Sequence, residues 1–171
     1  MKQFVFGGAR SGKSRLAEQL CAQYGDKVAY IATANKAWND TEMEARISRH
    51  RQQRPAHWHT IEAPVALADA LTALQGYDAV MIDCLTLWLS NCLHQGNWPQ
   101  QRQDFLNALE NVNGELVIVS NEVGMGIVPL GELSRSFVDE SGFLHQAVAA
   151  RCQRVIFTAA GLPLVMKGPA L

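Results

Sequence analysis

The sequence predicts an α/β fold, with a mostly parallel sheet that carries helices on both faces. Two observations lead to this prediction. Short apolar runs rich in β-branched and aromatic residues alternate along the chain with longer segments of helical periodicity. The apolar runs are continuous, as is typical of parallel strands buried on both faces. The length of 171 residues predicts a single domain over residues 1–171.

The expected elements follow one another with short connections. Strands are expected at Gln3–Phe6, Val28–Thr33, Ala79–Asp83, Glu115–Ser120 and Arg154–Thr158. Helices are expected at Lys13–Tyr24, Glu42–Gln53, Val65–Gln75, Gln101–Asn111 and Ser141–Arg151. Segment Cys92–Gln100 is predicted to be an exposed loop, because its glycine, asparagine and proline favour irregular structure.

The helix at Glu42–Gln53 has the clearest boundaries. Thr41 and Glu44 have the spacing of a capping box, in which two side chains bond the free amides of the first helical turn. Pro55 lies just beyond the expected end, where proline commonly follows a helix.

Composition and charge exclude several classes of protein. The chain has 15 Lys and Arg against 16 Asp and Glu, whereas proteins that bind nucleic-acid backbones carry a basic excess. No apolar run approaches the roughly 18 residues of a membrane span. The four cysteines are scattered and form no CxxC pair, so we expect a reduced, cytoplasmic protein without disulfides. They lie at Cys21, Cys84, Cys92 and Cys152.

The strongest motif follows the first expected strand. It reads Gly7-Gly8-Ala9-Arg10-Ser11-Gly12-Lys13-Ser14 and fits GxxxxGK[ST] between a strand and a helix. In such a loop, backbone amides and the helix N-terminus bind phosphate oxygens. Lys13 would reach the β- and γ-phosphates, and the Ser14 hydroxyl would bind Mg²⁺. The motif therefore predicts a P-loop NTPase-like fold; the alternative is a glycine-rich turn without a ligand.

Two further groups of polar residues follow expected strands. Asp83 ends an apolar run, where its carboxylate would complete the Mg²⁺ site or cap the next helix. Asn121 and Glu122 follow a later strand, with Gly124 and Gly126 close behind. These residues would enter the crevice at the carboxyl ends of the strands. The alternative for them is an ordinary turn with polar caps.

His50 lies among four arginines, Arg46, Arg49, Arg51 and Arg54. A neutral imidazole is a good nucleophile toward phosphorus, and the guanidinium groups would bind the phosphates of its target. They would also lower the pKa of His50 by like-charge repulsion. The spacing alone favours the alternative, a histidine packed on the helix face beside Met43 and Ile47.

The remaining histidines and the tryptophans carry weaker signals. His57 and His59 could bind a metal as an H-x-H pair, but no third ligand is near in sequence. His94 and His145 are expected to be ordinary surface or boundary residues. The tryptophans are expected to serve packing rather than to stack on a ligand; they are Trp38, Trp58, Trp88 and Trp98.

Together these motifs resemble one family across essentially the whole chain. The matching segments are GGARSGKS at Gly7–Ser14, YIAT at Tyr30–Thr33, Arg46-Ile47 with His50, and NEVGMGIVP at Asn121–Pro129. They resemble the bifunctional adenosylcobinamide kinase / adenosylcobinamide-phosphate guanylyltransferase of cobalamin biosynthesis. In that family a histidine at the position of His50 becomes covalently guanylylated.

The resemblance implies further site residues and a subunit arrangement. Thr33, Ala34 and Asn35 would contact GTP phosphates, Arg54 and Glu62 would belong to the nucleotide site, and Asp83 would bind Mg²⁺. The family is trimeric, so a homotrimer is implied. This chain departs from the family pattern at Asp83, Phe143 and His145, and its segment Lys36–Asn39 is longer than in some relatives.

The function implied by the resemblance has two steps. A nucleoside triphosphate, ATP or GTP with Mg²⁺, phosphorylates adenosylcobinamide. His50 then attacks GTP, and the GMP passes to adenosylcobinamide phosphate to give adenosylcobinamide-GDP and pyrophosphate. Two alternatives stay open at this point: a single-activity small-molecule kinase with a structural His50, or a GTP-dependent switch or assembly protein.

Overall fold

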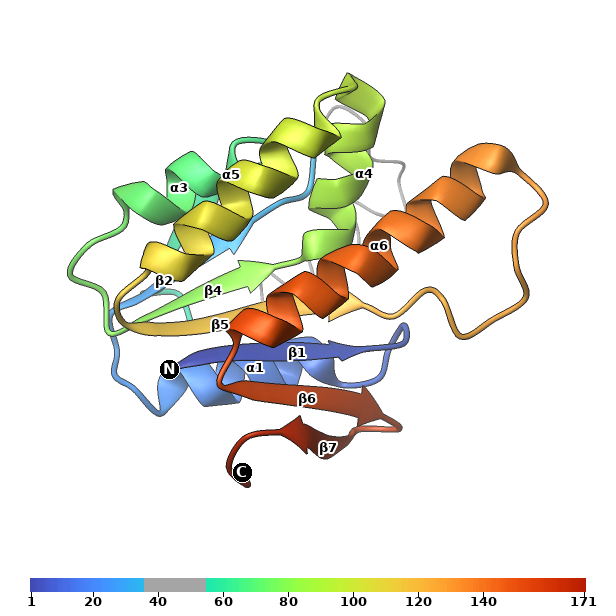
Figure 1. Ribbon diagram of the computed structural model, residues 1–171. Coiled ribbons are helices and arrows are strands. Elements are labelled where there is room, and N and C mark those ends of the chain that lie inside the picture. The colour runs from blue at the N-terminus through green and yellow to red at the C-terminus, as the bar shows by residue number, and fades with distance from the viewer. Residues whose placement is uncertain (36–54) are drawn as a thin grey trace.

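The structure is a computed structural model that describes residues 1–35 and 55–171 (Figure 1). A seven-stranded sheet runs through its middle in the order β3-β2-β4-β5-β1-β6-β7. All neighbouring strands are parallel except β6 and β7. The strands are β1 (Lys2–Gly7), β2 (Val28–Ala32), β3 (His59–Glu62), β4 (Ala79–Asp83), β5 (Glu115–Asn121), β6 (Arg154–Ala159) and β7 (Leu162–Lys167).

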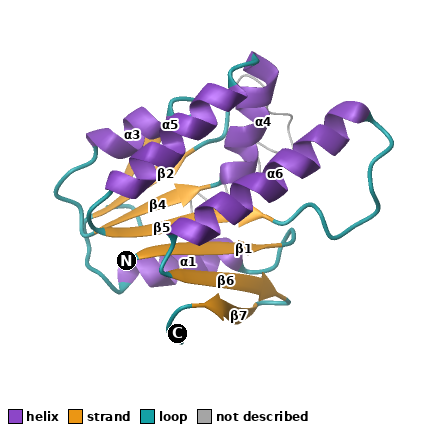
Figure 2. Cartoon of the chain, viewed as in Figure 1, coloured by secondary structure: helices purple, strands orange, loops and turns teal. Residues whose placement is uncertain are grey.

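Helices cover both faces of the sheet, as the sequence predicts (Figure 2). One face packs against α1 (Lys13–Ala22). The opposite face packs against α3 (Leu67–Ala73), α4 (Leu85–Gln95), α5 (Trp98–Asn111) and α6 (Glu132–Arg151). Alternate residues of a strand point to opposite faces, so Phe4 joins the larger core under α4–α6 and Val5 joins the core under α1.

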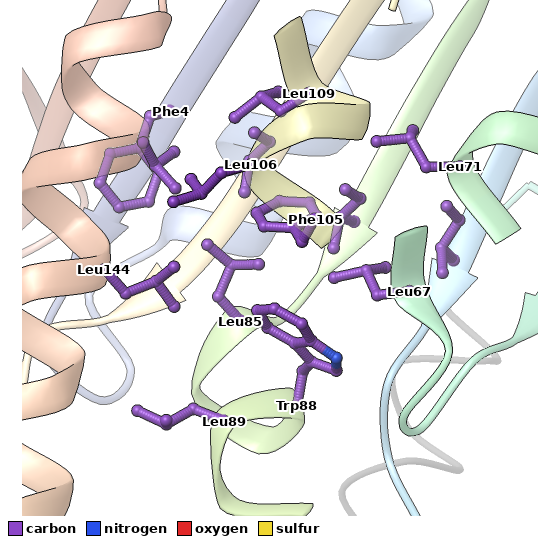
Figure 3. Close-up of a cluster of buried hydrophobic side chains, with 14 of the residues drawn as sticks. Phe4, Leu67, Leu71, Leu85, Trp88, Leu89, Phe105, Leu106, Leu109 and Leu144 are labelled. Carbon is purple, nitrogen blue, oxygen red and sulfur yellow. The ribbon is translucent and has the colours of Figure 1, made fainter. Parts of the chain in front are cut away.

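The larger core combines leucine side chains with the aromatic rings of Phe4, Trp88 and Phe105 (Figure 3). Trp88 is fully buried and packs edge-on against Phe105, with ring centroids 5.0 Å apart. Its indole N–H donates to the Val65 carbonyl oxygen at 2.8 Å, which satisfies the polar end of a buried ring. Trp58 and Trp98 are buried as well, so the predicted packing role is confirmed for these three tryptophans. Trp38 lies outside the described residues.

The predicted loop at Cys92–Gln100 is wrong. Residues 92–95 are the last turn of α4, and α5 begins at Trp98, so the connection is only Gly96 and Asn97. Gly96 has a φ of +70°, the left-handed conformation that commonly ends a helix. Pro99 lies in the first turn of α5, where its missing N–H costs nothing. These residues mark a helix end and a helix start rather than a long loop.

Several other boundaries differ from the prediction. Helix α6 begins at Glu132, nine residues before the expected start, and strands β3 and β7 were not expected at all. Both missed strands lie at edges of the sheet, where exposed residues interrupt the apolar pattern. The helix predicted at Glu42–Gln53 lies outside the described residues.

All four cysteines are buried and free. Within residues 1–35 and 55–171, no helix is both long and apolar enough to span a membrane.

Candidate active site

The candidate site lies at the edge of the sheet where the parallel strands end. Gly7 of β1 pairs with Asn121 of β5, and Val119 of β5 pairs with Asp83 of β4. The ends of these three strands are therefore neighbours, with β5 between the other two. In open α/β sheets, ligands bind beyond this edge. The structure brings together the three polar segments that the sequence predicts for this crevice.

The glycine-rich segment forms a tight turn between β1 and α1. Arg10 and Gly12 both have left-handed backbone conformations, with φ of +55° and +94°. When left-handed and right-handed backbone conformations alternate along a segment, consecutive backbone amides converge and create an anion-binding concavity. Helix α1 begins directly afterwards at Lys13, so its positive dipole end lies beside the same space. The local structure is the one that the motif predicts.

This turn is held by the hairpin of β6 and β7. The Ser11 and Thr158 hydroxyl groups bond each other at 2.8 Å, and the Gly161 N–H donates to the Ser11 carbonyl oxygen at 3.0 Å. A Cβ on Gly12 would lie 3.2 Å from Gly161 Cα, and a Cβ on Gly7 would clash with the Thr158 carbonyl oxygen. Gly7 and Gly12 are therefore required because the backbone of the β6–β7 hairpin lies too close for a side chain at either position. Neither Thr158 nor Gly161 is predicted from the sequence as part of the site.

Lys13 is nearly buried, with 8% of its surface exposed. Its ammonium donates to the Gly8 carbonyl oxygen at 2.9 Å, so the side chain is folded back over the turn. Burial lowers the pKa of Lys13, and the nearby Cys84 and Asp83 side chains oppose that shift. A phosphate in the turn would favour the charged form in the same way as Asp83 does.

Asp83 is held at the end of β4 by a neighbouring strand. Its Oδ2 accepts a hydrogen bond of 2.6 Å from the Tyr30 hydroxyl, a contact that the sequence does not predict. Cys84, not Asp83, is the N-cap residue of α4, so the alternative role of Asp83 as the cap of that helix is not observed. The donor set of Asp83 and Ser14, one carboxylate and one hydroxyl oxygen, fits Mg²⁺.

The residues that follow β2 are placed farther from the turn. The Thr33 hydroxyl is buried and bonds both the N–H and the carbonyl oxygen of Cys84, at 2.9 and 2.7 Å. Its side chain therefore fixes the segment after Asp83, and the half-buried Ala34 and Asn35 extend beyond the strand. Their predicted contact with GTP stays a prediction.

Glu62 ends β3, at the same edge of the sheet but four strands from β1. Four spacings of about 4.8 Å place it roughly 19 Å from the phosphate turn. Any role in the nucleotide site would therefore be at a distance from phosphates held in that turn, and this role also stays a prediction.

Asn121 and Glu122 lie where the sequence predicts, next to the glycine-rich turn. The Glu122 N–H donates to the Gly7 carbonyl oxygen at 2.9 Å, which joins the two segments. The expectation that His145 is a surface or boundary residue is wrong: it is buried on α6, and its Nε2 lies 2.7 Å from Ser120 Oγ. Its place on the buried face of α6 follows from a helical repeat, in which Ser141, Leu144, His145 and Val148 are buried.

Other predicted site residues are not placed in this crevice. His50, Arg51 and Arg54 lie outside the described residues, and their predicted roles stay predictions. His57 and His59 are exposed, and the His59 Nδ1 bonds the Tyr77 hydroxyl.

Comparisons with solved structures show the fold. The flagellar accessory protein FlaH of Methanocaldococcus jannaschii matches with a TM-score of 0.53 and 13% identity, over 98% of this chain and 78% of that one. An ATPase from the type III secretion system of pathogenic bacteria matches with a TM-score of 0.52 and 13% identity, over 91% and 50%. These likenesses agree with the predicted P-loop NTPase-like fold and say nothing more.

Comparisons of sequence are more specific. The bifunctional adenosylcobalamin biosynthesis protein CobP of Pseudomonas aeruginosa is 52% identical over 176 residues, which cover both chains completely. Proteins named CobU from Escherichia coli and Salmonella typhimurium are 36% and 38% identical, over 98% of this chain and all of theirs. A sequence model of the family described as cobinamide kinase / cobinamide phosphate guanyltransferase matches residues 3–166. The chain therefore belongs to the cobinamide kinase / cobinamide phosphate guanyltransferase family.

Proposed function

We propose that this protein phosphorylates adenosylcobinamide and then transfers GMP from GTP to the resulting phosphate, giving adenosylcobinamide-GDP. The observation that carries this proposal is family membership over nearly the whole chain. The formed phosphate turn, with the Lys13 ammonium folded over it, supports a reaction on nucleoside triphosphates. Either ATP or GTP is the phosphate donor of the first step.

In the first step the turn at Gly7–Ser14 holds the phosphates of the donor. Lys13 neutralises the negative charge that shifts between the phosphates during transfer. The attraction between its ammonium and that charge is stronger where the site excludes water. Ser14 and Asp83 would hold Mg²⁺, which neutralises charge on the β- and γ-phosphates when bound. The oxygen of the acceptor hydroxyl bonds to the γ-phosphorus as the nucleoside diphosphate departs.

In the second step His50 is the nucleophile. A ring nitrogen of His50 bonds to the α-phosphorus of GTP, the bond to the β-phosphate oxygen breaks, and pyrophosphate leaves. The oxygen of adenosylcobinamide phosphate then displaces the imidazole and takes the GMP. Arg51 and Arg54 follow His50 closely in the sequence, and we assign them to binding the phosphates of GTP.

Intact mass tests the second step. The protein is incubated with GTP and Mg²⁺ without a corrinoid, and we expect a mass increase of one GMP. His50→Ala protein should gain no mass and should keep part of its kinase activity, because phosphoryl transfer needs no protein nucleophile. Kinase activity in the unmutated protein without any adduct or guanylyl transfer would indicate a single-activity kinase instead.

The Mg²⁺ site can be tested at Asp83. In Asp83→Asn the amide keeps the shape of the carboxylate and its bond with Tyr30, but it removes the charge that attracts the cation. We expect a higher Mg²⁺ concentration for half-maximal kinase activity, with an unchanged melting temperature. An unchanged Mg²⁺ requirement would remove Asp83 from the site.

We also propose that the protein is a cytoplasmic homotrimer. The loop after β5 exposes apolar side chains that a monomer would leave in water, with Ile127 and Leu130 almost fully exposed. Contact between subunits would cover them. The four buried free thiols support a reducing compartment.

A further inference from the structure

A chain of buried polar groups runs behind the candidate site, and the steps proposed above do not use it. The Asn121 N–H bonds Thr86 Oγ1 at 2.8 Å, and Thr86 Oγ1 lies 3.2 Å from Ser120 Oγ. Ser120 Oγ lies 2.7 Å from His145 Nε2. The other ring nitrogen of His145, Nδ1, lies 3.8 Å from Glu122 Oε2. This series of polar groups therefore begins at the backbone of β5 and ends at the Glu122 carboxylate.

The hydrogen-bond partners are compatible with one direction for the hydrogens along this series of polar groups. A backbone N–H only donates, so Thr86 accepts from Asn121 and its own hydrogen is available to Ser120. Burial lowers the pKa of His145 more than the Glu122 carboxylate raises it, which favours the neutral ring. When Ser120 donates to Nε2, the neutral ring carries its hydrogen on Nδ1, the nitrogen 3.8 Å from Glu122 Oε2. In that tautomer the imidazole presents an N–H to the carboxylate.

The segment Glu122–Gly124 contacts the phosphate turn at one end and approaches the wall of a large cavity at the other. Its own N–H bonds Gly7 at the start of the turn, and its Oε1 accepts from the Gly124 N–H at 2.5 Å. A Cβ on Gly124 would lie 3.7 Å from Val138 of α6, and Val138 lines the cavity. This cavity, of about 570 Å³, lies between α4 and α6 and is mostly apolar, with Leu93 and Phe137 in its wall.

We propose that Glu122 is a catalytic residue of the kinase step and that His145 is its positioning residue. Glu122 accepts a hydrogen bond from the acceptor hydroxyl, which approaches from the cavity side. As the hydroxyl oxygen bonds to the γ-phosphorus and the nucleoside diphosphate leaves, the proton passes to the Glu122 carboxylate and then to water. His145 Nδ1 lies 3.8 Å from the carboxylate, so the ring restricts movement of the carboxylate away from the turn. This inference rests on the proposed kinase activity.

The first test compares Glu122→Gln with Glu132→Gln, a matched change at an exposed position of α6. The amide cannot take a proton, so we expect kinase kcat to fall by about a hundredfold or more in Glu122→Gln. The KM for the nucleotide should stay the same, and Glu132→Gln should match the unmutated protein. Formation of the GMP adduct needs no acceptor, so its rate should change by less than about threefold in Glu122→Gln.

Two outcomes would overturn the role of Glu122. Kinase kcat within about threefold of the unmutated value would remove it from the chemistry. Equal losses of kinase activity and of adduct formation would assign it to the nucleotide site instead. A failure of the proposed function is distinguishable, because the unmutated protein would then not phosphorylate adenosylcobinamide at all.

The second test asks whether His145 acts through Glu122. His145→Leu removes both polar ring atoms, and we expect kinase kcat to fall by about tenfold to a hundredfold at an unchanged nucleotide KM. His145→Asn keeps an N–H close to the Nδ1 position and should recover most of that loss. Adding either change to Glu122→Gln should cost nothing further, because the carboxylate that His145 orients is already absent.

Multiplicative losses in the double variants would show that His145 acts independently and would overturn its positioning role. If the leucine variant does not fold, His145→Asn is compared with His145→Gln, which keeps the bond with Ser120 but presents no N–H to Glu122. His145→Gln should then lose more activity than His145→Asn, and the reverse order would contradict the proposal.

Discussion

The two sides of the candidate site are built differently. On the side of β6, the phosphate turn is fixed by short hydrogen bonds to Ser11 and by backbone contacts that leave no room for a side chain at Gly7. On the side of α6, the loop after β5 exposes Met125, Ile127 and Leu130. One side is complete within a single chain, and the other presents apolar surface beside an open cavity.

This difference indicates that the two sides of the site bind different groups. Phosphates are the same in every nucleoside triphosphate, so a rigid cradle of backbone amides can be formed before the ligand arrives. The loop after β5 and the cavity present apolar surface that a large acceptor or a neighbouring subunit would cover. Glu122 and His145 lie at the boundary between the two sides.

The largest effect is expected at Lys13, in the rigid side. Lys13→Ala removes a buried ammonium that, in the proposed mechanism, neutralises phosphate charge in both reactions. We expect losses of several kcal/mol in transition-state stabilisation for kinase turnover and for GMP-adduct formation alike. Steady-state kinetics and intact mass measure the two. Near-normal kinase turnover at saturating nucleotide and Mg²⁺ would show that the turn is not catalytic.

A smaller effect on stability is expected at Gly7. The new Cβ in Gly7→Ala would meet the Thr158 carbonyl oxygen, and we expect a loss of about 1–3 kcal/mol in the free energy of unfolding. Gly8→Ala is the matched control, because nothing lies within 4 Å of its Cβ position. Denaturant unfolding measures both. Equal stabilities would show that the hairpin does not constrain the turn.

The buried imidazole at the boundary should make stability depend on pH. Its pKa is lowered in the folded chain from the ordinary 6.5, so below about pH 6.5 the unfolded chain binds a proton that the folded chain does not. Below about pH 6.5 the free energy of unfolding should decrease by at most about 1.4 kcal/mol for each pH unit. Above pH 7 the titration of His145 should no longer make the free energy of unfolding depend on pH. His145→Asn lacks the titrating group. The stability difference between the two proteins should therefore change between pH 7.5 and 5.5, and a constant difference would contradict a buried neutral ring.

The smallest effect on folding is expected in the exposed loop. Ile127 is 98% exposed, so Ile127→Ser should change the free energy of unfolding of a subunit by less than about 0.5 kcal/mol. The same change should weaken the proposed trimer, as measured by sedimentation, whereas Leu171→Ser at the C-terminus should not. Unchanged assembly in Ile127→Ser would remove this loop from the subunit contact.

The sequence predicts the central sheet and the phosphate turn well, because both depend on local patterns. Four apolar residues followed by Asp83 define β4 without reference to the rest of the fold. The edge strands were missed for a physical reason: β7 carries Pro163 and mostly exposed residues, so it has no continuous apolar run. Pairing with β6 rather than intrinsic preference makes it a strand.

The missed site residues have a related cause. The contact of Tyr30 with Asp83 joins residues 53 positions apart, and that of Ser120 with His145 joins residues 25 apart. No local pattern encodes such contacts. The burial of His145 could be predicted from the repeat of Ser141, Leu144, His145 and Val148, which lies within the expected helix at Ser141–Arg151.

In the proposed mechanism one phosphate turn serves two reactions, the second through a covalent bond to His50. The most direct measurement follows the fate of GTP labelled separately at the α- and γ-phosphates. The α-label should stay on the protein and the γ-label should leave as pyrophosphate, and the bound label should be lost in acid and retained in alkali, because protonation of imidazole weakens its bond to phosphorus. Guanylyl transfer without any α-label on the protein would contradict the covalent mechanism, and α-label on His50→Ala protein would assign the bond to another residue.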